Sequence, residues 1–325
     1  MAGERAFGEV RDLGAQSGGR REAFRGDSTM TNALSVDVED YFQVRSLASV
    51  VPLSTWENYE RRFPASTKRL LELFSRFGAK CTFFVLGWNA VKEPGLVRDI
   101  VAAGHEIASH GWNHALVYEQ SPREFREDVL RTKSVLEDIS GARVAGYRAA
   151  SYSVTSKSIW ALDILAETGH LYDSSIYPIR RRVYGMPGER RDPHVKLTRE
   201  GPLAEFPMPA VRLGLWNVPF ASGAYLRAAP FWITERLLRS VNGGGAGRGE
   251  GGAKPAGRRG IPVVVNVHPW ELDAGQPRLR SFLRRPNHYL CLGATEEKLA
   301  RLLRSHSFKS VRTVLEELGL LERAG

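Results

Sequence analysis

The sequence predicts an α/β protein in which strands and helices alternate around one core. Its 325 residues, 42% of them hydrophobic, are enough to bury a full core. Short apolar runs alternate with longer stretches of helical periodicity, and no repeat of fixed period divides the chain into unrelated halves. We therefore expect a single folded domain over residues 30–325.

Each strand is predicted by a short apolar or β-branched run, and each helix by apolar residues recurring about every 3.6 positions. The run Ala33-Leu34-Ser35-Val36 begins the first strand, and Gly104 marks a turn before the third. The predicted strands are 33–38, 81–86, 105–109, 144–147, 203–206 and 262–267. The predicted helices are 65–77, 94–103, 122–139, 157–168, 230–241, 295–305 and 311–320.

Two segments look like additions to this core. Residues 1–29 are rich in Gly, Arg and Glu and lack apolar periodicity, so we expect a disordered tail. Because Met30 directly precedes the first strand, the tail is also interpreted as an artefact of start-site choice. Residues 243–260 are of low complexity and glycine-rich, which predicts a flexible insertion.

Three acidic residues follow the first predicted strand. Asp37, Glu39 and Asp40 come directly after Ala33-Leu34-Ser35-Val36, where burial is costly unless a cation or hydrogen bonds compensate the charges. Alternation along an extended chain places the side chains of Asp37 and Glu39 on the same side. A strand that simply ends in a solvated acidic turn is the structural alternative.

Histidines follow two other predicted strands. His110-Gly-Trp-Asn-His114 lies on a loop after strand 105–109, and His268 follows strand 262–267. Two imidazoles and one carboxylate leave a catalytic zinc ion with one open position, where a bound water becomes acidic enough to attack at neutral pH. A further carboxylate and a third histidine would move protons, so the set predicts a hydrolase. Iron(II) oxygenases use the same ligand types.

These motifs resemble those of a known family, the NodB-like polysaccharide deacetylases of carbohydrate esterase family 4. Within that family the chain is most similar to the branch associated with exopolysaccharide biosynthesis and exosortase systems. The resemblance covers roughly residues 31–320 and rests on five ordered motifs. The motifs are Ala-Leu-Ser-Val-Asp-Val-Glu-Asp-Tyr-Phe (33–42), His-Gly-Trp-Asn-His (110–114), Gly-Tyr-Arg-Ala-Ala-Ser-Tyr (146–152), Tyr-Asp-Ser-Ser (172–175) and Val-His-Pro-Trp-Glu (267–271).

The resemblance implies a distorted (β/α)7 barrel and a role for each motif. It implies a divalent metal, most simply Zn²⁺, held by Glu39, His110 and His114, with Asp40 as the fallback carboxylate. Asp37 would be the general base and His268 the general acid. Arg148 would hold Asp37 ionised, and Asp173 would orient the His268 imidazole and raise its pKa. Tyr152, Trp270 and Glu271 would line the substrate site, although a packed Trp270 and a solvated Glu271 are equally compatible with the sequence.

Two positions depart from the usual motifs. In the common first motif two aspartates are adjacent, whereas Val38 separates Asp37 from Glu39 here, which assigns the metal carboxylate to Glu39. Ala150 stands where the family usually has proline in the third motif. Loss of that ring removes a constraint on φ but no reacting group.

The implied reaction is removal of N-acetyl groups from a polysaccharide or its lipid-linked precursor, in exopolysaccharide or cell-wall biosynthesis. Some members of the wider superfamily open small cyclic amides with a similar ligand set, so that reaction is the alternative. A non-catalytic glycan-binding module is a further alternative, although all the reacting residues are present.

Charge and targeting features narrow the expected partners. The net charge of +10 suits an anionic surface or an acidic glycan, but no zinc finger, stacking motif or recognition-helix pattern favours nucleic acid. The sequence shows no secretory signal and no apolar run long enough to span a membrane. Cys81 lies within an apolar strand and suits a buried thiol. We therefore expect cytoplasmic residence, with peripheral membrane association left open.

Overall fold

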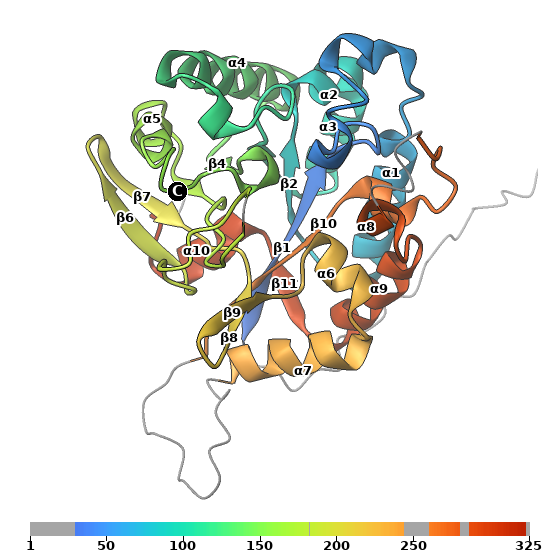
Figure 1. Cartoon of the computed structure of the whole chain (residues 1–325), viewed down its shortest axis with the longest axis vertical. Helices are drawn as coiled ribbons and strands as arrows, with labels where there is room; N and C mark the ends of the chain where they lie inside the picture. Colours follow the sequence, from blue (N-terminus) through green and yellow to red (C-terminus); the bar gives the residue numbers. More distant parts are fainter. Residues whose placement is uncertain (1–29, 182, 244–259, 280–285, 323–325) are drawn as a thin grey trace, which may run out of the picture.

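A computed structural model describes residues 30–181, 183–243, 260–279 and 286–322. The predicted tail 1–29 and nearly all of the predicted insertion 243–260 lie outside these residues. Seven parallel strands form the central sheet in the order β10-β1-β2-β3-β4-β5-β7 (Figure 1). Their bounds are β1 Thr31–Val38, β2 Thr82–Val85, β3 Glu106–Ser109, β4 Gly146–Tyr147, β5 Tyr172–Asp173, β7 Gly201–Glu205 and β10 Val264–Val267.

The sheet curls but its two end strands do not pair with each other. Antiparallel β6 (His194–Thr198) extends it beyond β7, and β11 (Ser307–Lys309) pairs with the start of β1. Between β7 and β10 the described chain makes one isolated bridge, from Ser222 to Asn266 on β10. The predicted (β/α)7 barrel is thus confirmed in its distorted form, as a half-barrel open along one seam.

Helices surround the sheet (Figure 1). Their bounds are α1 Phe63–Phe77, α2 Gly87–Lys92, α3 Pro94–Ala102, α4 Pro122–Ser140, α5 Ala161–Glu167, α6 Gly223–Ala228, α7 Phe231–Asn242, α8 Pro286–Tyr289, α9 Ala294–Ser305 and α10 Val311–Glu317. A separate hairpin of β8 (Ala210–Leu213) and β9 (Trp216–Pro219) lies in the lower part of Figure 1, whereas α4 lies at the top.

Local signals explain where the main elements begin and end. The Ser121 hydroxyl accepts from the Glu124 N–H while the Glu124 carboxylate accepts from the Ser121 N–H, so a capping box starts α4. Gly141, with φ of 65°, ends that helix in the left-handed region. Strand β1 is buried on both faces, as expected for a central parallel strand, and this explains its nearly continuous apolar run.

The predicted elements are present with shifts of a few residues at their ends. The short elements are the ones that periodicity did not indicate: α2, α6, α8, β5 and β11, the edge strand β6 and the β8–β9 hairpin. Runs of two to six residues carry too few positions for a period to be recognised. Among the described helices, none combines the length and apolar character needed to cross a bilayer.

The side chain of Tyr172 on β5 packs closely against Gly146 on β4. A Cβ atom built there would lie 2.0 Å from Cζ of Tyr172, which is fully buried and whose hydroxyl donates to Glu106 Oε1. Replacing Gly146 with alanine therefore forces β4 and β5 apart. We expect Gly146→Ala to lower the free energy of unfolding by about 1–3 kcal/mol, measured by urea denaturation.

Gly95 is the matched control, since a Cβ atom there meets nothing within 4 Å. It lies in the first turn of α3, where alanine is the better helix former. Gly95→Ala should leave stability unchanged or slightly raised. A Gly146→Ala protein as stable as the Gly95→Ala protein would contradict this account of the β4–β5 contact.

Candidate active site

The predicted site residues meet at the carboxyl ends of the parallel strands. Asp37 and Glu39 follow β1, His110 and His114 follow β3, and His268 follows β10. Arg148 comes directly after β4, and Asp173 is the last residue of β5. Loops at this end of a parallel barrel are where catalytic groups gather, because neighbouring strands point there together.

Glu39, His110 and His114 form a compact ligand set. Oε1 of Glu39 lies 3.0 Å from Nε2 of His110 and 3.1 Å from Nε2 of His114. Burial would raise the pKa of Glu39, but the two imidazoles outweigh it and hold that pKa well below its usual range. One oxygen and two ring nitrogens converging on the same space are the donor set of an open zinc site.

The His110 ring is held in one tautomer. Its Nδ1 lies 2.8 Å from the carbonyl oxygen of Arg148, so Nδ1–H donates there and Nε2 is the nitrogen that faces Glu39. Metal-ligating histidines commonly make this contact, because it fixes the orientation of the ring.

The histidine loop is fixed from two sides. Asp128 on α4 accepts from the Trp112 N–H, and Gly87 and Trp88 donate to the carbonyls of Gly111 and Trp112. A Cβ atom at Gly87 would lie 2.4 Å from the Trp112 ring, so only glycine allows this approach. The loop that carries both histidines is therefore positioned by α2 and α4.

Asp40 lies apart from the ligand set. Its carboxylate accepts hydrogen bonds from the backbone N–H groups of Tyr41, Arg62 and Phe63. Burial raises its pKa to about 6 against the lowering effect of these donors. Asp40 thus anchors the start of α1, and Glu39 is the carboxylate beside the histidines.

Asp37 and His268 lie on the other side of Glu39. Together with Glu39 they form a second set whose ligand-type atoms lie within 4.8 Å of one another. Oδ2 of Asp37 is 3.7 Å from Nε2 of His268, and that nitrogen is 4.0 Å from Oε1 of Glu39. The predicted convergence of Asp37 and Glu39 is thus present, even though β1 ends at Val38, between them.

A buried guanidinium holds Asp37. Nη1 of Arg148 lies 2.8 Å from Oδ1 of Asp37, and Nδ2 of Asn266 donates to its Oδ2 at 2.9 Å. Burial would raise the pKa of Asp37, but Arg148, with smaller effects from His110 and His268, lowers it below its usual value. Asp37 is therefore an ionised carboxylate whose geometry is fixed by two donors.

Arg148 itself is satisfied on all its nitrogens. Nη1 also donates to Ser35 Oγ and Asn266 Oδ1, each at 2.8 Å. Nε and Nη2 donate to the carbonyl and hydroxyl oxygens of Ser174. Ser35 and Asn266 face each other across β1 and β10, and neither was assigned a role from the sequence. Ser35 and Asn266 each lie two residues before a predicted site residue, Asp37 and His268, and so on the same face of the strand; this spacing could have indicated that they reach the site.

The predicted partner of His268 is wrong. The nearby carboxylate is Glu271, whose Oε2 lies 3.3 Å from Nδ1 of His268, a charge contact without hydrogen-bond alignment. The same oxygen accepts from the His268 N–H at 3.0 Å. The expected rise in the His268 pKa is also corrected: burial lowers it, and Glu39 and Asp37 oppose that only in part.

Asp173 has other contacts. Its carboxylate accepts from the hydroxyl and the N–H of Ser175, and it faces Glu205 across β5 and β7. Burial and the neighbouring Asp173 raise the pKa of Glu205 well above its usual value. Asp173 supports the loop after β5 instead of orienting the imidazole, because residue 173 lies inside the β5–β7 pairing and not beside β10.

Glu271 and Trp270 are both buried. Glu271 pairs with the buried Arg227 of α6, which corrects the expectation of a solvated carboxylate. Trp270 is 7% exposed, stacks on His288 at 4.4 Å between ring centroids and lies 5.3 Å from the His268 ring. Trp270 packs against the His268 imidazole, and both Trp270 and Glu271 are buried instead of facing solvent.

Tyr152 lies beside the Asp37 cluster. Its hydroxyl accepts from Nδ2 of Asn266 at 3.0 Å, the same nitrogen that contacts Asp37. The backbone N–H of Tyr152 donates to the Ala149 carbonyl in a turn, and Ser151 and Tyr152 both have positive φ angles. The sharp turn after Arg148 thus brings the phenol to the site, although no proline stands at position 150.

Comparison with known families assigns two regions of the chain. Residues 53–170 match the family described as polysaccharide deacetylase, and residues 174–248 and 250–316 match a domain of unknown function (DUF3473). The first match begins after Asp37 and Glu39, so those two residues are connected to the site by the geometry above.

Curated relatives align over short stretches. A peptidoglycan-N-acetylglucosamine deacetylase of Listeria monocytogenes is 36% identical over 75 residues, 23% of this chain and 16% of that protein. A chitooligosaccharide deacetylase of Bradyrhizobium is 29% identical over 103 residues, 32% of this chain and 45% of that protein. The aligned stretches thus span less than half the length of these two relatives.

Solved structures share the fold. A Mycobacterium smegmatis protein described as a polysaccharide deacetylase superposes with a TM-score of 0.57 at 19% identity, covering 91% of this chain and 95% of that one. The allantoinase Puue superposes with a TM-score of 0.53 at 16% identity, covering 95% and 94%. At these identities the likeness is one of fold.

The ligand geometry predicts which carboxylate binds metal. Glu39→Ala, His110→Ala and His114→Ala should each lose bound zinc after dialysis, because each removes one of three donors. Asp40→Ala should keep zinc but lower the melting temperature, since it removes the acceptor for three backbone donors. Atomic absorption of the purified proteins measures this. Zinc retained in Glu39→Ala and lost in Asp40→Ala would reverse the assignment.

Proposed function

Because residues 53–170 match the polysaccharide deacetylase family, we propose that this chain removes N-acetyl groups from a polysaccharide or its lipid-linked precursor by metal-dependent hydrolysis. The observation that carries the proposal is the pair of ligand-type clusters that share Glu39: one suited to a metal ion, the other to proton transfer. Exopolysaccharide or cell-wall biosynthesis in the cytoplasm, with an acetylated glycan as partner, is the setting we propose.

Glu39, His110 and His114 fit a divalent cation, with Zn²⁺ as our choice. The fit rests on the convergent nitrogens and on the tautomer that the Arg148 carbonyl imposes on His110. A cation bound there would acidify a water molecule and polarise the acetyl carbonyl. The remaining steps belong to side chains of the chain itself.

Asp37 is the proposed general base. Arg148 donates to Oδ1 of Asp37 and keeps the carboxylate ionised, and Asn266 donates to Oδ2. Because each carboxylate oxygen has two lone pairs, the second lone pair of Oδ2 can accept the proton of the attacking water. The Arg148 contact also prevents the carboxylate from rotating. Asp37 thus faces the same space as the metal donors without being one of the three.

His268 is the proposed general acid. Its Nε2 faces Asp37 and Glu39, and a proton on that nitrogen is within reach of an amine that leaves from the same space. Glu271 lies beside Nδ1 and favours the charged imidazole, whereas burial disfavours it. Attack by water breaks the amide C–N bond, and the proton from His268 completes the amine while acetate forms.

The alternative reaction, opening of a small cyclic amide, would use the same groups. The allantoinase shares the fold with this chain just as the deacetylase does, so fold likeness favours neither reaction. A substrate panel separates them, because deacetylation releases acetate from N-acetylated oligosaccharides whereas ring opening of a cyclic amide releases none. Metal-loaded full chain that releases no acetate from any N-acetylated glycan would overturn the proposal. A non-catalytic glycan-binding module would bind the same oligosaccharides without turnover, and an iron(II) oxygenase would need oxygen.

The acid role predicts a contrast between substrates. His268→Ala should depress turnover of an N-acetyl sugar on the order of 10²–10⁴-fold, because an amine leaves only when protonated. Hydrolysis of phenyl acetate should fall far less, since phenolate leaves without a proton. Asp37→Asn is the matched control and should slow both substrates while retaining zinc. Equal losses for both substrates in His268→Ala would place His268 in metal binding or structure.

The contact of Glu271 with His268 predicts a positioning role. Glu271→Gln should lower N-acetyl turnover on the order of 10- to 100-fold with zinc content unchanged, because the imidazolium loses its neighbouring charge. It should also destabilise the fold, since buried Arg227 loses its anionic partner. The double variant Arg227→Met/Glu271→Gln should regain stability but not turnover.

Asp173→Asn is the comparison that separates the two carboxylates. The asparagine side chain has the shape of aspartate and can still accept from the Ser175 hydroxyl. Because Asp173 does not contact His268, we expect turnover of phenyl acetate and of the N-acetyl sugar to change by the same small factor. A selective loss with the N-acetyl substrate in Asp173→Asn, and none in Glu271→Gln, would restore the sequence-based assignment.

A further inference from the structure

The β8–β9 hairpin carries an unusual tip. Gly214 and Leu215 form its two-residue turn, between the paired Leu213 and Trp216. Gly214 has a φ of 58°, which suits the first turn position of a tight hairpin. Turns are ordinarily polar, yet Leu213, Leu215 and Trp216 are 53%, 87% and 63% exposed. Three large apolar side chains within four residues are therefore turned to solvent.

The hairpin is anchored at its base and projects at its tip. Ala210 and Val211 are buried whereas residues 212–216 are exposed, and Asn217 donates to the carbonyl of Pro178. In Figure 1 the hairpin lies in the lower part of the molecule, away from α2 and α4 at the top, which support the histidine loop. The apolar tip thus has a rigid base and is separate from the proposed catalytic centre.

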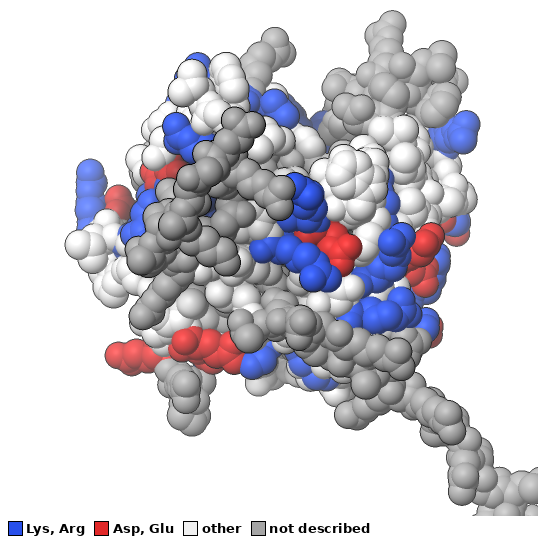
Figure 2. Space-filling model, turned by 90° about the horizontal axis from the view of Figure 1, so that it is seen from below, with Lys and Arg blue, Asp and Glu red and all other residues white. Residues whose placement is uncertain are grey.

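Arginines surround this tip. A hollow of about 760 Å³ beside the hairpin is lined by Arg180, Arg181 and Arg212 together with Leu215 and Trp216, and its described lining includes no Asp or Glu. Figure 2 views the molecule from below and shows Lys and Arg side chains in several groups over its described part, with Asp and Glu side chains beside some of them. Cationic side chains around exposed leucine and tryptophan are the composition of a membrane-interface segment.

We propose that the β8–β9 tip docks the protein on an anionic lipid surface. Leu213, Leu215 and Trp216 would enter the boundary between head groups and acyl chains, where the amphipathic indole is favoured. Arg180 and Arg212 would meet lipid phosphates, with their aliphatic stems on the apolar side. Charge complementarity selects acidic lipids, and the apolar tip distinguishes a bilayer from a soluble anion.

The test is co-sedimentation of the full chain with vesicles. We expect binding to mixed phosphatidylglycerol and phosphatidylcholine vesicles and little binding to phosphatidylcholine alone. Leu215→Ser/Trp216→Ser should weaken binding on the order of tenfold or more. Arg180→Gln/Arg212→Gln should weaken it about five-fold for each charge removed, since each arginine contributes about 1 kcal/mol near such a surface. Circular dichroism and acetate release should be unchanged in both variants, because neither touches the site residues.

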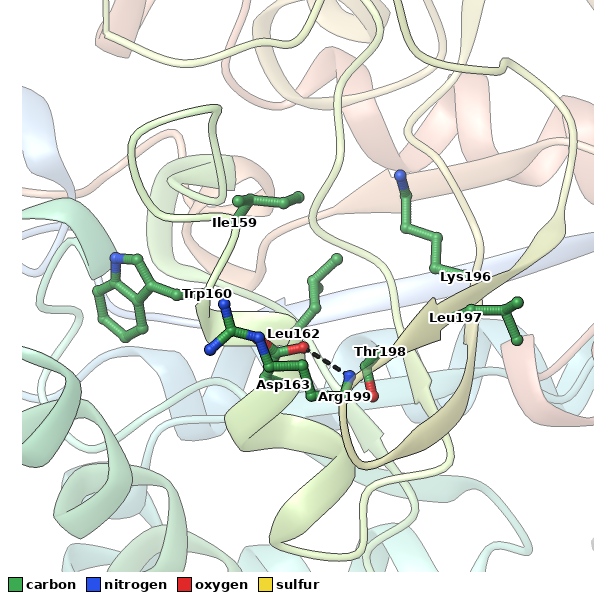
Figure 3. Close-up of a pocket in the computed structure, with 8 residues that line it drawn as sticks. All are labelled: Ile159, Trp160, Leu162, Asp163, Lys196, Leu197, Thr198 and Arg199. Carbon is green, nitrogen blue, oxygen red and sulfur yellow. Dashed lines mark hydrogen bonds and ion pairs between the residues drawn. The ribbon is translucent and has the colours of Figure 1, made fainter.

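Matched controls come from elsewhere on the surface. Leu197 on β6 is 89% exposed beside the pocket between α5 and β6, where Asp163 accepts from the Arg199 N–H (Figure 3). Leu197→Ser removes an equally exposed leucine. Arg123→Gln/Arg199→Gln removes two exposed charges, as the hairpin double variant does. Both control proteins should bind vesicles as the unmodified chain does.

Four outcomes would overturn the proposal. The first is that the unmodified chain fails to bind acidic vesicles. The second is that the control variants lose as much vesicle binding as the hairpin variants do. Soluble polygalacturonate would bind in an arginine-dependent way while Leu215→Ser/Trp216→Ser kept full vesicle binding, which would make the hollow an acidic-glycan subsite. Alternatively, sedimentation velocity would reveal a dimer that Leu215→Ser/Trp216→Ser dissolves while vesicles remain unbound, which would assign the tip to a second copy of the chain.

Discussion

The buried guanidinium of Arg148 is the contact on which the site depends. A fully buried positive charge is costly unless every donor finds an acceptor. Here the acceptors come from three strands or the residues directly after them: Ser35 and Asp37 from β1, Ser174 after β5 and Asn266 from β10. Phe84 of β2 covers the guanidinium at 4.1 Å. Arg148 therefore ties the strands of an unclosed barrel together at the end where chemistry is proposed.

The same contact explains why the seam between β7 and β10 does not disturb the site. Asn266 is the residue at which the single backbone bridge to Ser222 forms, and its side chain bonds to Arg148 and Asp37. A few residues after Ser222, Arg227 on α6 holds Glu271 beneath the His268 loop. The segment that contains Ser222 and Arg227 therefore both fills the seam and supports His268, the proposed acid. Closure of the fold and placement of His268 depend on the same packing.

Sequence reasoning succeeded where a strand is buried and ends in polar residues. The carboxyl ends of β1, β3 and β10 were recognisable because apolar runs stop at Asp37, His110 and His268. Strand β6 was not predicted because it is an edge strand whose alternate residues are exposed, and β5 was not predicted because it is only two residues long. Short elements are defined by their neighbours in the sheet more than by their own sequence.

The error at Asp173 has a related cause. Order along the chain placed Asp173 in a plausible motif, but only the sheet order reveals that β5 and β10 are not neighbours. Glu271 had a local signal that went unused: it lies three residues after His268, the spacing at which a side chain returns to the first backbone N–H of a turn. Local spacing was here more informative than resemblance.

Strand β1 also sets the order in which the protein can be completed. It is made first, yet it pairs with β10 and β11, which are made last, and Ser35 meets Asn266 across 231 positions of sequence. At ordinary rates of synthesis the ribosome adds those residues on the order of ten to fifty seconds after β1. Until then one edge of the central strand is unpaired and Oδ2 of Asp37 lacks its donor from Asn266, and pairings so distant in sequence form slowly. In a growing chain that edge of β1 is therefore open to other pairings, and no nascent fragment lacking β10 holds the complete centre.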